Sequence, residues 1–149
     1  MVEVLDETKQ WPSPSALEQI FESFLSQLSL SKDLTVILCD DTFIKERNLE
    51  DRGLNEATDV LSYPMMEPQD VNMPEVGHLG DIFISVDTAR RQAKEHNHSL
   101  TEEILTLAAH GLMHLRGFDH PTEEAWQDFH EAQKQILELF HQGPSHGDQ

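Results

Sequence analysis

The chain has 149 residues, of which 38% are hydrophobic, and this length suits one domain with its own core rather than two. It carries 28 acidic against 10 basic residues, a formal net charge of −18, so its long-range field repels nucleic acids and anionic membranes. The composition therefore argues against non-specific binding of RNA through a broad basic surface. An RNA substrate would need a local basic or metal-bearing cleft.

The cysteine content and the N-terminus indicate the compartment. Cys39 is the single cysteine, which excludes an internal disulfide and fits a reducing environment. It lies in the apolar run LTVILC, so we predict a core thiol rather than a nucleophile. The N-terminus MVEVLDETKQW has no apolar signal core, and no apolar run approaches the roughly 20 residues that span a bilayer. The sequence therefore predicts a cytoplasmic protein without a membrane partner.

Hydrophobic periodicity predicts the helices and strands along the chain. In order they are a strand at 2–5, a helix from Ser15, a strand at 34–39, a helix to about Leu49, strands at 60–63 and 78–85, and helices at about 86–97, 100–115 and 122–141. Capping boxes are predicted where Ser15 precedes Glu18 and where Ser99 precedes Glu102, because each side chain can satisfy a free backbone donor of the first turn. Asp40 or Asp41 is predicted to cap the second helix.

This order of elements predicts an α/β (α+β) fold with a small mixed four-stranded sheet packed with about five helices. The sheet is expected to be mixed because short links between the late strands allow an antiparallel pair. Residues 65–77 contain two prolines and no periodicity, which predicts an exposed loop. We expect one domain over residues 1–141, followed by a polar, frayed tail at 142–149.

The stretch HGLMHLRGFDH places His110, His114 and His120 at relative positions zero, four and ten. The first two lie one helical turn apart at the edge of the buried face, and Gly117 allows the chain to turn back toward them. Three imidazoles at this spacing predict a metal site. Zinc is the expected ion because three protein ligands leave a fourth position for water, while other transition metals remain open. Asp119 either orients an imidazole by a hydrogen bond or caps the turn.

Metalloproteases with this spacing carry Glu directly after the first histidine, whereas this chain has Gly111. An open zinc site lowers the pKa of its water to about 7, so metal hydroxide can hydrolyse a substrate without a dedicated base. Peptide cleavage is disfavoured because its amine leaving group needs a general acid. Cleavage of a phosphodiester depends less on a general acid, because its leaving group is an ester oxygen. It depends more on a cation that stabilises the charge developing on the phosphoryl oxygens.

These residues resemble the YbeY family of single-strand-specific endoribonucleases, also called rRNA maturation factors. HGLMHLRGFDH matches every fixed position of the family pattern H-G-x-x-H-L-x-G-[YF]-D-H. A second block is NLEDRGLNEATDVLSYP, from Asn48 to Pro64, with Tyr63 where the family usually has Phe, and a third is LGDIFIS. The resemblance covers about residues 33–141.

The resemblance implies a metal-dependent endoribonuclease that acts on single-stranded regions of ribosomal RNA precursors, in rRNA maturation and ribosome quality control. It implies His110, His114 and His120 as metal ligands, with His114 and Arg52 in catalytic positions, and the ribosomal subunit or ribosomal proteins as partners. Arg52 can bind phosphate oxygens bidentately. From the residues alone, a surface ion pair of Arg52 remains the alternative.

Two other functions stay open. A non-catalytic, metal-stabilised ribosome assembly factor would use the acidic surface to bind basic ribosomal proteins or would bind rRNA. A metallopeptidase has only the histidine spacing in its favour. For Thr58, Asp59 and Asp81 we expect structural roles such as turn bonds and strand capping, and the basic stretch at 90–98 is expected to be a solvated helix face.

Overall fold

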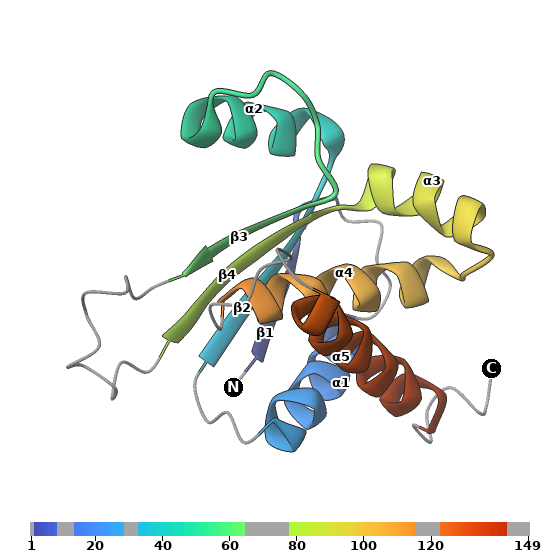
Figure 1. Ribbon diagram of the computed structural model, residues 1–149. Helices are drawn as coiled ribbons and strands as arrows, with labels where there is room; N and C mark the ends of the chain where they lie inside the picture. Colours follow the sequence, from blue (N-terminus) through green and yellow to red (C-terminus); the bar gives the residue numbers. More distant parts are fainter. Residues whose placement is uncertain (1, 9–13, 29–32, 65–77, 116–122, 143–149) are drawn as a thin grey trace.

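The computed structural model describes residues 2–8, 14–28, 33–64, 78–115 and 123–142 (Figure 1). These residues form, in chain order, β1 (Val2–Asp6), α1 (Pro14–Gln27), β2 (Asp33–Cys39), α2 (Asp41–Arg52), β3 (Val60–Pro64), β4 (His78–Ser85), α3 (Val86–His96), α4 (Leu100–Leu115) and α5 (Glu123–Gln142). The predicted single-domain α/β fold, with a mixed four-stranded sheet and five helices, is confirmed. No helix in the described ranges is long and apolar enough to cross a membrane.

The sheet has the strand order β1-β2-β4-β3. β1 and β4 both run parallel to β2, whereas β3 pairs antiparallel with β4, where Leu61 lies opposite Phe83. The sheet is therefore mixed, as predicted, with one antiparallel pair. β3 lies at one edge of the sheet.

The two faces of the sheet carry two separate apolar clusters. Ile82 and Ile84 of β4 belong to the larger core with residues of α1, α4 and α5, while Phe83 belongs to a smaller cluster with Ile44 of α2. This follows from the two-residue period of a strand, which sends successive side chains to opposite faces. Figure 1 shows α1, α4 and α5 together on one side of the sheet and α2 standing apart from them.

Cys39 belongs to the smaller cluster and is buried, as predicted. Burial, reinforced by the charges of Asp40 and Asp41, raises the pKa of its thiol to about 12. A thiol with this pKa is protonated at neutral pH, and because the thiolate is the nucleophilic form, Cys39 has a structural role.

Two of the predicted helix caps are confirmed. Asp40 caps α2 by accepting a hydrogen bond from the backbone N–H of Phe43 at 2.8 Å. Ser99 and Glu102 form the reciprocal capping box of α4, with N···O distances of 2.9 and 3.1 Å.

The predicted capping box at Ser15 and Glu18 is wrong, because α1 already begins at Pro14. Glu18 instead accepts a hydrogen bond from the backbone N–H of Val4 at 2.8 Å, and Glu22 accepts one from Val2 at 3.2 Å. These N–H groups lie on the free edge of β1, where a strand has no neighbour to accept from it. The two carboxylates of α1 thus complete the hydrogen bonding of an edge strand.

The start of α2 is tied to α3 through Asp41. Its carboxylate accepts hydrogen bonds from the hydroxyl groups of Ser85 and Thr88, both at 2.6 Å, and pairs with Arg91 at 3.0 Å. Burial tends to raise the pKa of Asp41, but the hydrogen bonds from Ser85, Thr88 and Arg91 prevail and lower it. This network fixes one end of the helix whose other end carries Arg52. It also means that Arg91, in the stretch expected to be solvated, has a structural partner.

Candidate functional site

Helix α4 is buried almost all round, with two exceptions that matter for function. Between Glu103 and Leu115 every residue is buried except His110, which is half-buried, and His114, which is exposed. These two rings, at the only open positions between Glu103 and Leu115, face the same side of the helix because residues four apart lie one turn above each other. The sequence-based placement of both histidines at the edge of the buried face is therefore correct.

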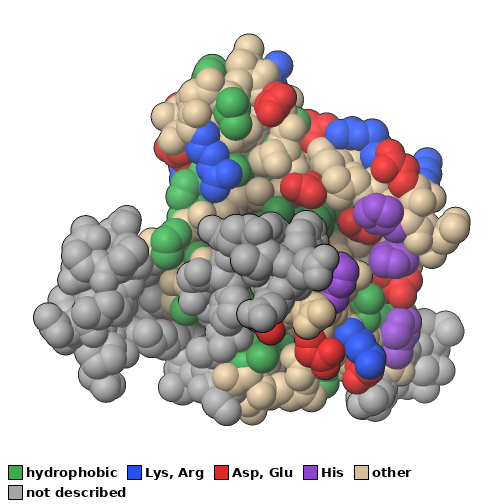
Figure 2. Space-filling view, in the orientation of Figure 1, with side chains coloured by type: hydrophobic (Ala, Val, Ile, Leu, Met, Phe, Trp, Pro, Cys, Tyr) green, Lys and Arg blue, Asp and Glu red, His purple; other side chains and the backbone are tan. Residues whose placement is uncertain are grey.

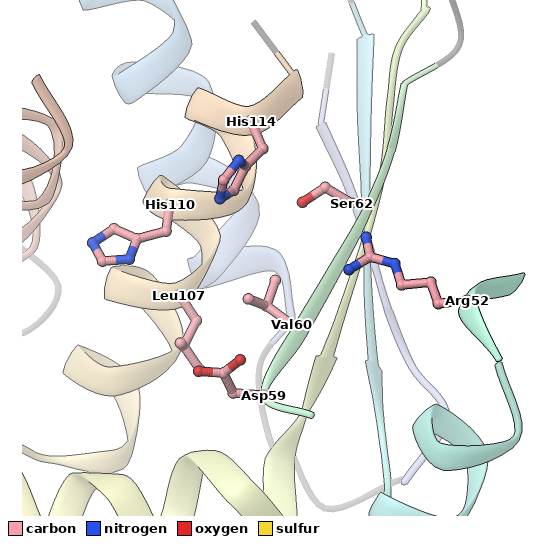
Figure 3. Close-up of a pocket in the computed structure, with 7 residues that line it drawn as sticks. All are labelled: Arg52, Asp59, Val60, Ser62, Leu107, His110 and His114. Atoms are coloured by element: carbon pink, nitrogen blue, oxygen red, sulfur yellow. The ribbon is translucent and has the colours of Figure 1, made fainter. Parts of the chain in front are cut away.

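His110 and His114 line a pocket of about 400 Å³ between α4 and the edge strand β3. The described lining residues are Arg52, Asp59, Val60, Ser62, Leu107, His110 and His114. Figure 3 shows α4 supplying one wall and β3 the other, with the guanidinium of Arg52 extending from α2 toward Ser62. Segments that are about fifty residues apart in the chain therefore meet in one cavity.

Arg52 reaches the pocket because α2 ends there. Gly53 takes the left-handed conformation, φ 72°, and its N–H closes the helix on the carbonyl groups of Asn48 and Leu49. The side chain of Asn48 is buried and donates a hydrogen bond to the carbonyl of Glu56 at 3.0 Å, which holds the link from α2 to β3. Arg52 itself is exposed and forms no hydrogen bond or ion pair with another described residue. Its guanidinium can thus receive an anion without breaking an existing contact.

The orientation of His110 is set by α5. Its Nε2 lies 3.2 Å from Oε1 of Gln133, an amide oxygen that would accept a hydrogen bond from the tautomer with its proton on Nε2. In that tautomer the lone pair is on Nδ1. Metal-binding histidines commonly donate their other N–H to an oxygen in this way, so the arrangement fits a metal ligand. His120 and Asp119 lie outside the described residues, as does Gly117, and the three-histidine set therefore stays a prediction.

Asp59 also lines the pocket, although the sequence predicts only a structural role for it. It has that role: its carbonyl accepts from the N–H of Ser85 at 2.9 Å, and its carboxylate accepts from Thr58 and Gln92, both at 3.3 Å. It also places a carboxylate in the cavity (Figure 3). Strand alternation gave no signal for it, because Val60 and Ser62 point to the face that α4 covers, and a residue one position before Val60 has the opposite phase.

Comparison with known proteins decides the family. Residues 3–141 match the sequence model described as Endoribonuclease YbeY. The chain belongs to this family. An endoribonuclease YbeY of Thermus thermophilus is 48% identical over 124 residues, covering 83% of this chain and 88% of that protein. One of Deinococcus radiodurans is 50% identical over 112 residues, covering 68% and 71%. A solution structure of a Thermotoga maritima protein has a TM-score of 0.67 at 27% identity and covers 98% of this chain and 95% of that one.

Membership confirms the resemblance to the YbeY endoribonucleases. The structure also explains Gly111, the residue that distinguishes this histidine motif from the motif of metalloproteases. Gly111 is buried where α4 crosses the sheet. A Cβ at this position would lie 2.9 Å from Cγ2 of Ile82 and 3.0 Å from Oγ of Ser62. Real Cβ atoms do not approach other atoms this closely, so the glutamate that serves as the protease base has no room here. The metallopeptidase alternative therefore keeps only the histidine spacing in its favour.

Proposed function

We propose that this chain is a metal-dependent endoribonuclease that cleaves single-stranded regions of ribosomal RNA precursors, in rRNA maturation and ribosome quality control. The observation that carries the proposal is that His110, His114 and Arg52 line one pocket. Metal-ligating imidazoles beside a guanidinium combine the two kinds of group that stabilise charge on a phosphoryl oxygen. The family membership supports the RNA substrate.

The residues proposed to hold the ion are His110, His114 and His120, with Asp119 hydrogen bonded to one of the imidazoles. Zinc suits three imidazole ligands best, although the ligand type also accommodates other transition metals. When bound, such an ion lowers the pKa of water and acts as a Lewis acid toward a phosphoryl oxygen. Gln133 contributes by orienting the His110 ring through the contact between its Oε1 and Nε2 of the imidazole.

The protein's own contribution is to bind and orient the phosphodiester. Arg52 approaches from α2 and offers donors to a non-bridging oxygen, while Val60 and Leu107 give the pocket apolar walls. Arg52 is the only permanent cation among the described lining residues, in a chain of net charge −18. Recognition of RNA is therefore local, through this pocket rather than through a broad basic face.

The acidic surface also bears on the partners. A net charge of −18 complements basic ribosomal proteins, so we propose that docking on the ribosomal subunit brings the pocket to its RNA. An exposed, unpaired strand can enter a pocket of about 400 Å³ more readily than a stiff duplex can. A cytoplasmic location remains a prediction based on the single cysteine.

The test is cleavage of a labelled single-stranded RNA and of the matched duplex by the full chain reconstituted with Zn²⁺. We expect Arg52→Ala and His114→Ala to lower the cleavage rate about 100-fold or more, as loss of a transition-state donor does elsewhere. Arg90→Ala is the matched control, because Arg90 is an exposed arginine of α3 that does not line the pocket. Equal cleavage by parent and His114→Ala protein would assign the activity to a contaminating nuclease.

The alternative of a non-catalytic assembly factor is separated by the effect of a chelator on stability. α4 packs in a continuous apolar core with α1 and α5, and His110 and His114 lie at its surface. We therefore expect the metal-free chain to stay folded, with cleavage lost and then restored by Zn²⁺. Collapse of the fold without metal would favour a structural ion and the assembly role.

A further inference from the structure

A second group of metal-ligating side chains lies at the junction of α3 and α4. Nδ1 of His96 is 3.0 Å from Oε1 of Glu103, Nδ1 of His98 is 3.5 Å from the same oxygen, and the three atoms lie within 4.8 Å of one another. The turn between the helices creates this geometry: Asn97 takes the left-handed conformation, φ 58°, and the N–H of His98 donates to the carbonyl of Ala93 at 2.9 Å. Figure 2 shows histidine side chains gathered beside acidic ones along this side of the molecule.

The distances suit a first-row divalent ion. An ion about 2.0–2.1 Å from each ligand atom holds these atoms roughly 3.0–3.4 Å apart. The two measured separations from Glu103 lie at or near this range, and His96, whose side chain is 53% exposed, has room to turn toward the third atom. Two imidazoles and one carboxylate form a ligand set used for zinc and for other transition metals.

The polar atoms around this junction are not fully satisfied by the described protein groups. The Glu103 side chain is only 2% exposed, so its carboxylate needs compensation from buried partners. Nδ1 of His98 and Oγ1 of Thr106 are buried and have no hydrogen-bond partner among the described residues. Both residues line the same cavity of about 490 Å³ as Glu103. Ordered water, or a bound ion together with its water, would satisfy these buried polar atoms.

We propose that His96, His98 and Glu103 bind a divalent transition-metal ion, of which Zn²⁺ is the simplest example, at a site distinct from the pocket of Arg52 and His114. The ion joins the C-terminus of α3 to the first turns of α4. Because Leu107, His110 and Asp59 line both cavities, it also places positive charge beside the candidate active site of an acidic chain. The proposal is independent of the endoribonuclease activity.

A histidine–glutamate contact alone does not make such a site, and the chain contains a matched control. Nε2 of His141 lies 3.1 Å from Oε2 of Glu102, nearly the distance between His96 and Glu103, and the His141 side chain is 56% exposed. Among the described residues, no third histidine, cysteine or carboxylate lies close enough to this pair to complete a metal-binding group. His141→Ala therefore removes an equivalent ion pair without removing a proposed ligand.

The experiment is calorimetric titration of the metal-stripped full chain, prepared without a histidine tag, with Zn²⁺ alone. The parent is expected to bind two equivalents, His98→Ala and His114→Ala one each, the double variant none, and His141→Ala two. In His96→Ala we expect the second site to weaken at least about 10-fold, since losing even an indirect partner of a ligand costs 10–100-fold. Circular dichroism of each metal-free variant shows whether it is folded. His96→Ala changes an exposed ligand and leaves the buried Glu103 in place, so it tests the site without disturbing the core.

The outcomes separate this site from the one in the proposed function. If His98→Ala binds as many equivalents as the parent, the proposal is overturned, whatever His114→Ala does. If His98→Ala loses one equivalent and His114→Ala loses none, the second site stands and the metal of the proposed function fails. Loss of an equivalent in His141→Ala as well would show non-specific binding to exposed histidines and would overturn the assignment.

Discussion

Replacement of Gly111 by alanine sets intrinsic helix propensity against tertiary packing. Alanine is favoured over glycine in a helix interior by about 1 kcal/mol, so propensity alone predicts that Gly111→Ala stabilises the protein. Gly111 is, however, buried against the sheet in the middle of α4, one residue after a proposed metal ligand. We expect the packing cost to outweigh the gain.

The magnitude follows from what the new methyl group would meet. It would lie 2.9 Å from Cγ2 and 3.2 Å from Cδ1 of Ile82, and 3.0 Å from Oγ of Ser62. Ile82 is fully buried in β4, which is hydrogen bonded to β2 on one side and β3 on the other, so it cannot retreat without moving the sheet. Overpacking of this kind costs about 1–3 kcal/mol, which leaves a net loss of up to about 2 kcal/mol after the propensity gain, and the rigid surroundings of Ile82 favour the upper half of this range.

The assay is urea unfolding of the metal-stripped chain, so that ion binding does not contribute to the free energy of unfolding. Gly111→Ala, Ser62→Ala and the double variant are compared with the parent. Because Ser62→Ala removes one of the crowded atoms, the double variant is expected to be more stable than the sum of the single effects by about 0.5 kcal/mol or more. A Gly111→Ala protein as stable as the parent, or more stable, would refute the reasoning.

Three further predictions concern positions outside the pocket walls. Cys39 should resist a thiol reagent at pH 8 in the native protein and react fully in denaturant, because burial raises its pKa to about 12; rapid native labelling would contradict this. The folded-state pKa of Asp41 is lowered, so its stabilisation is present above the unfolded pKa of about 3.9 and is lost as pH falls through the folded value. Asp41→Asn should thus cost about 1 kcal/mol in urea unfolding at pH 7 and progressively less below pH 4, and a cost independent of pH would refute the assignment. Gly53→Ala should cost about 1 kcal/mol through its left-handed φ alone, since nothing lies within 4 Å of the added methyl, and an unchanged urea midpoint would contradict this.

Much of the fold could be predicted because its signals are local. The strands at 34–39 and 78–85 and the helix at 100–115 follow from periodicity, and the structure places them at nearly the same bounds. The order of the elements predicted a mixed sheet, and the structure shows that β3 and β4 form its antiparallel pair. The capping box predicted at Ser15 failed because Glu18 accepts a hydrogen bond from Val4, which lies fourteen residues earlier in the chain, and spacing within the helix cannot reveal that donor.

The candidate site divides in the same way. The convergence of His110 and His114 is a property of one helix and was readable from a spacing of four. Arg52 was assigned through the family resemblance, since nothing in its local sequence distinguishes it from a surface arginine. Asp59 was underestimated because its hydrogen bonds and its place in the pocket depend on α3 and α4, which follow it in the chain.

Most elements, the family and the pairing of the two helical histidines could be predicted from the sequence, because each depends on residues within a few turns of one another or on a motif in fixed order. Three features required the folded structure: the approach of Arg52 to α4, the contact of Gly111 with Ile82, and the meeting of His96 and His98 with Glu103. These contacts arise when separate elements pack, and packing distances of a few tenths of an ångström are not encoded in any local spacing.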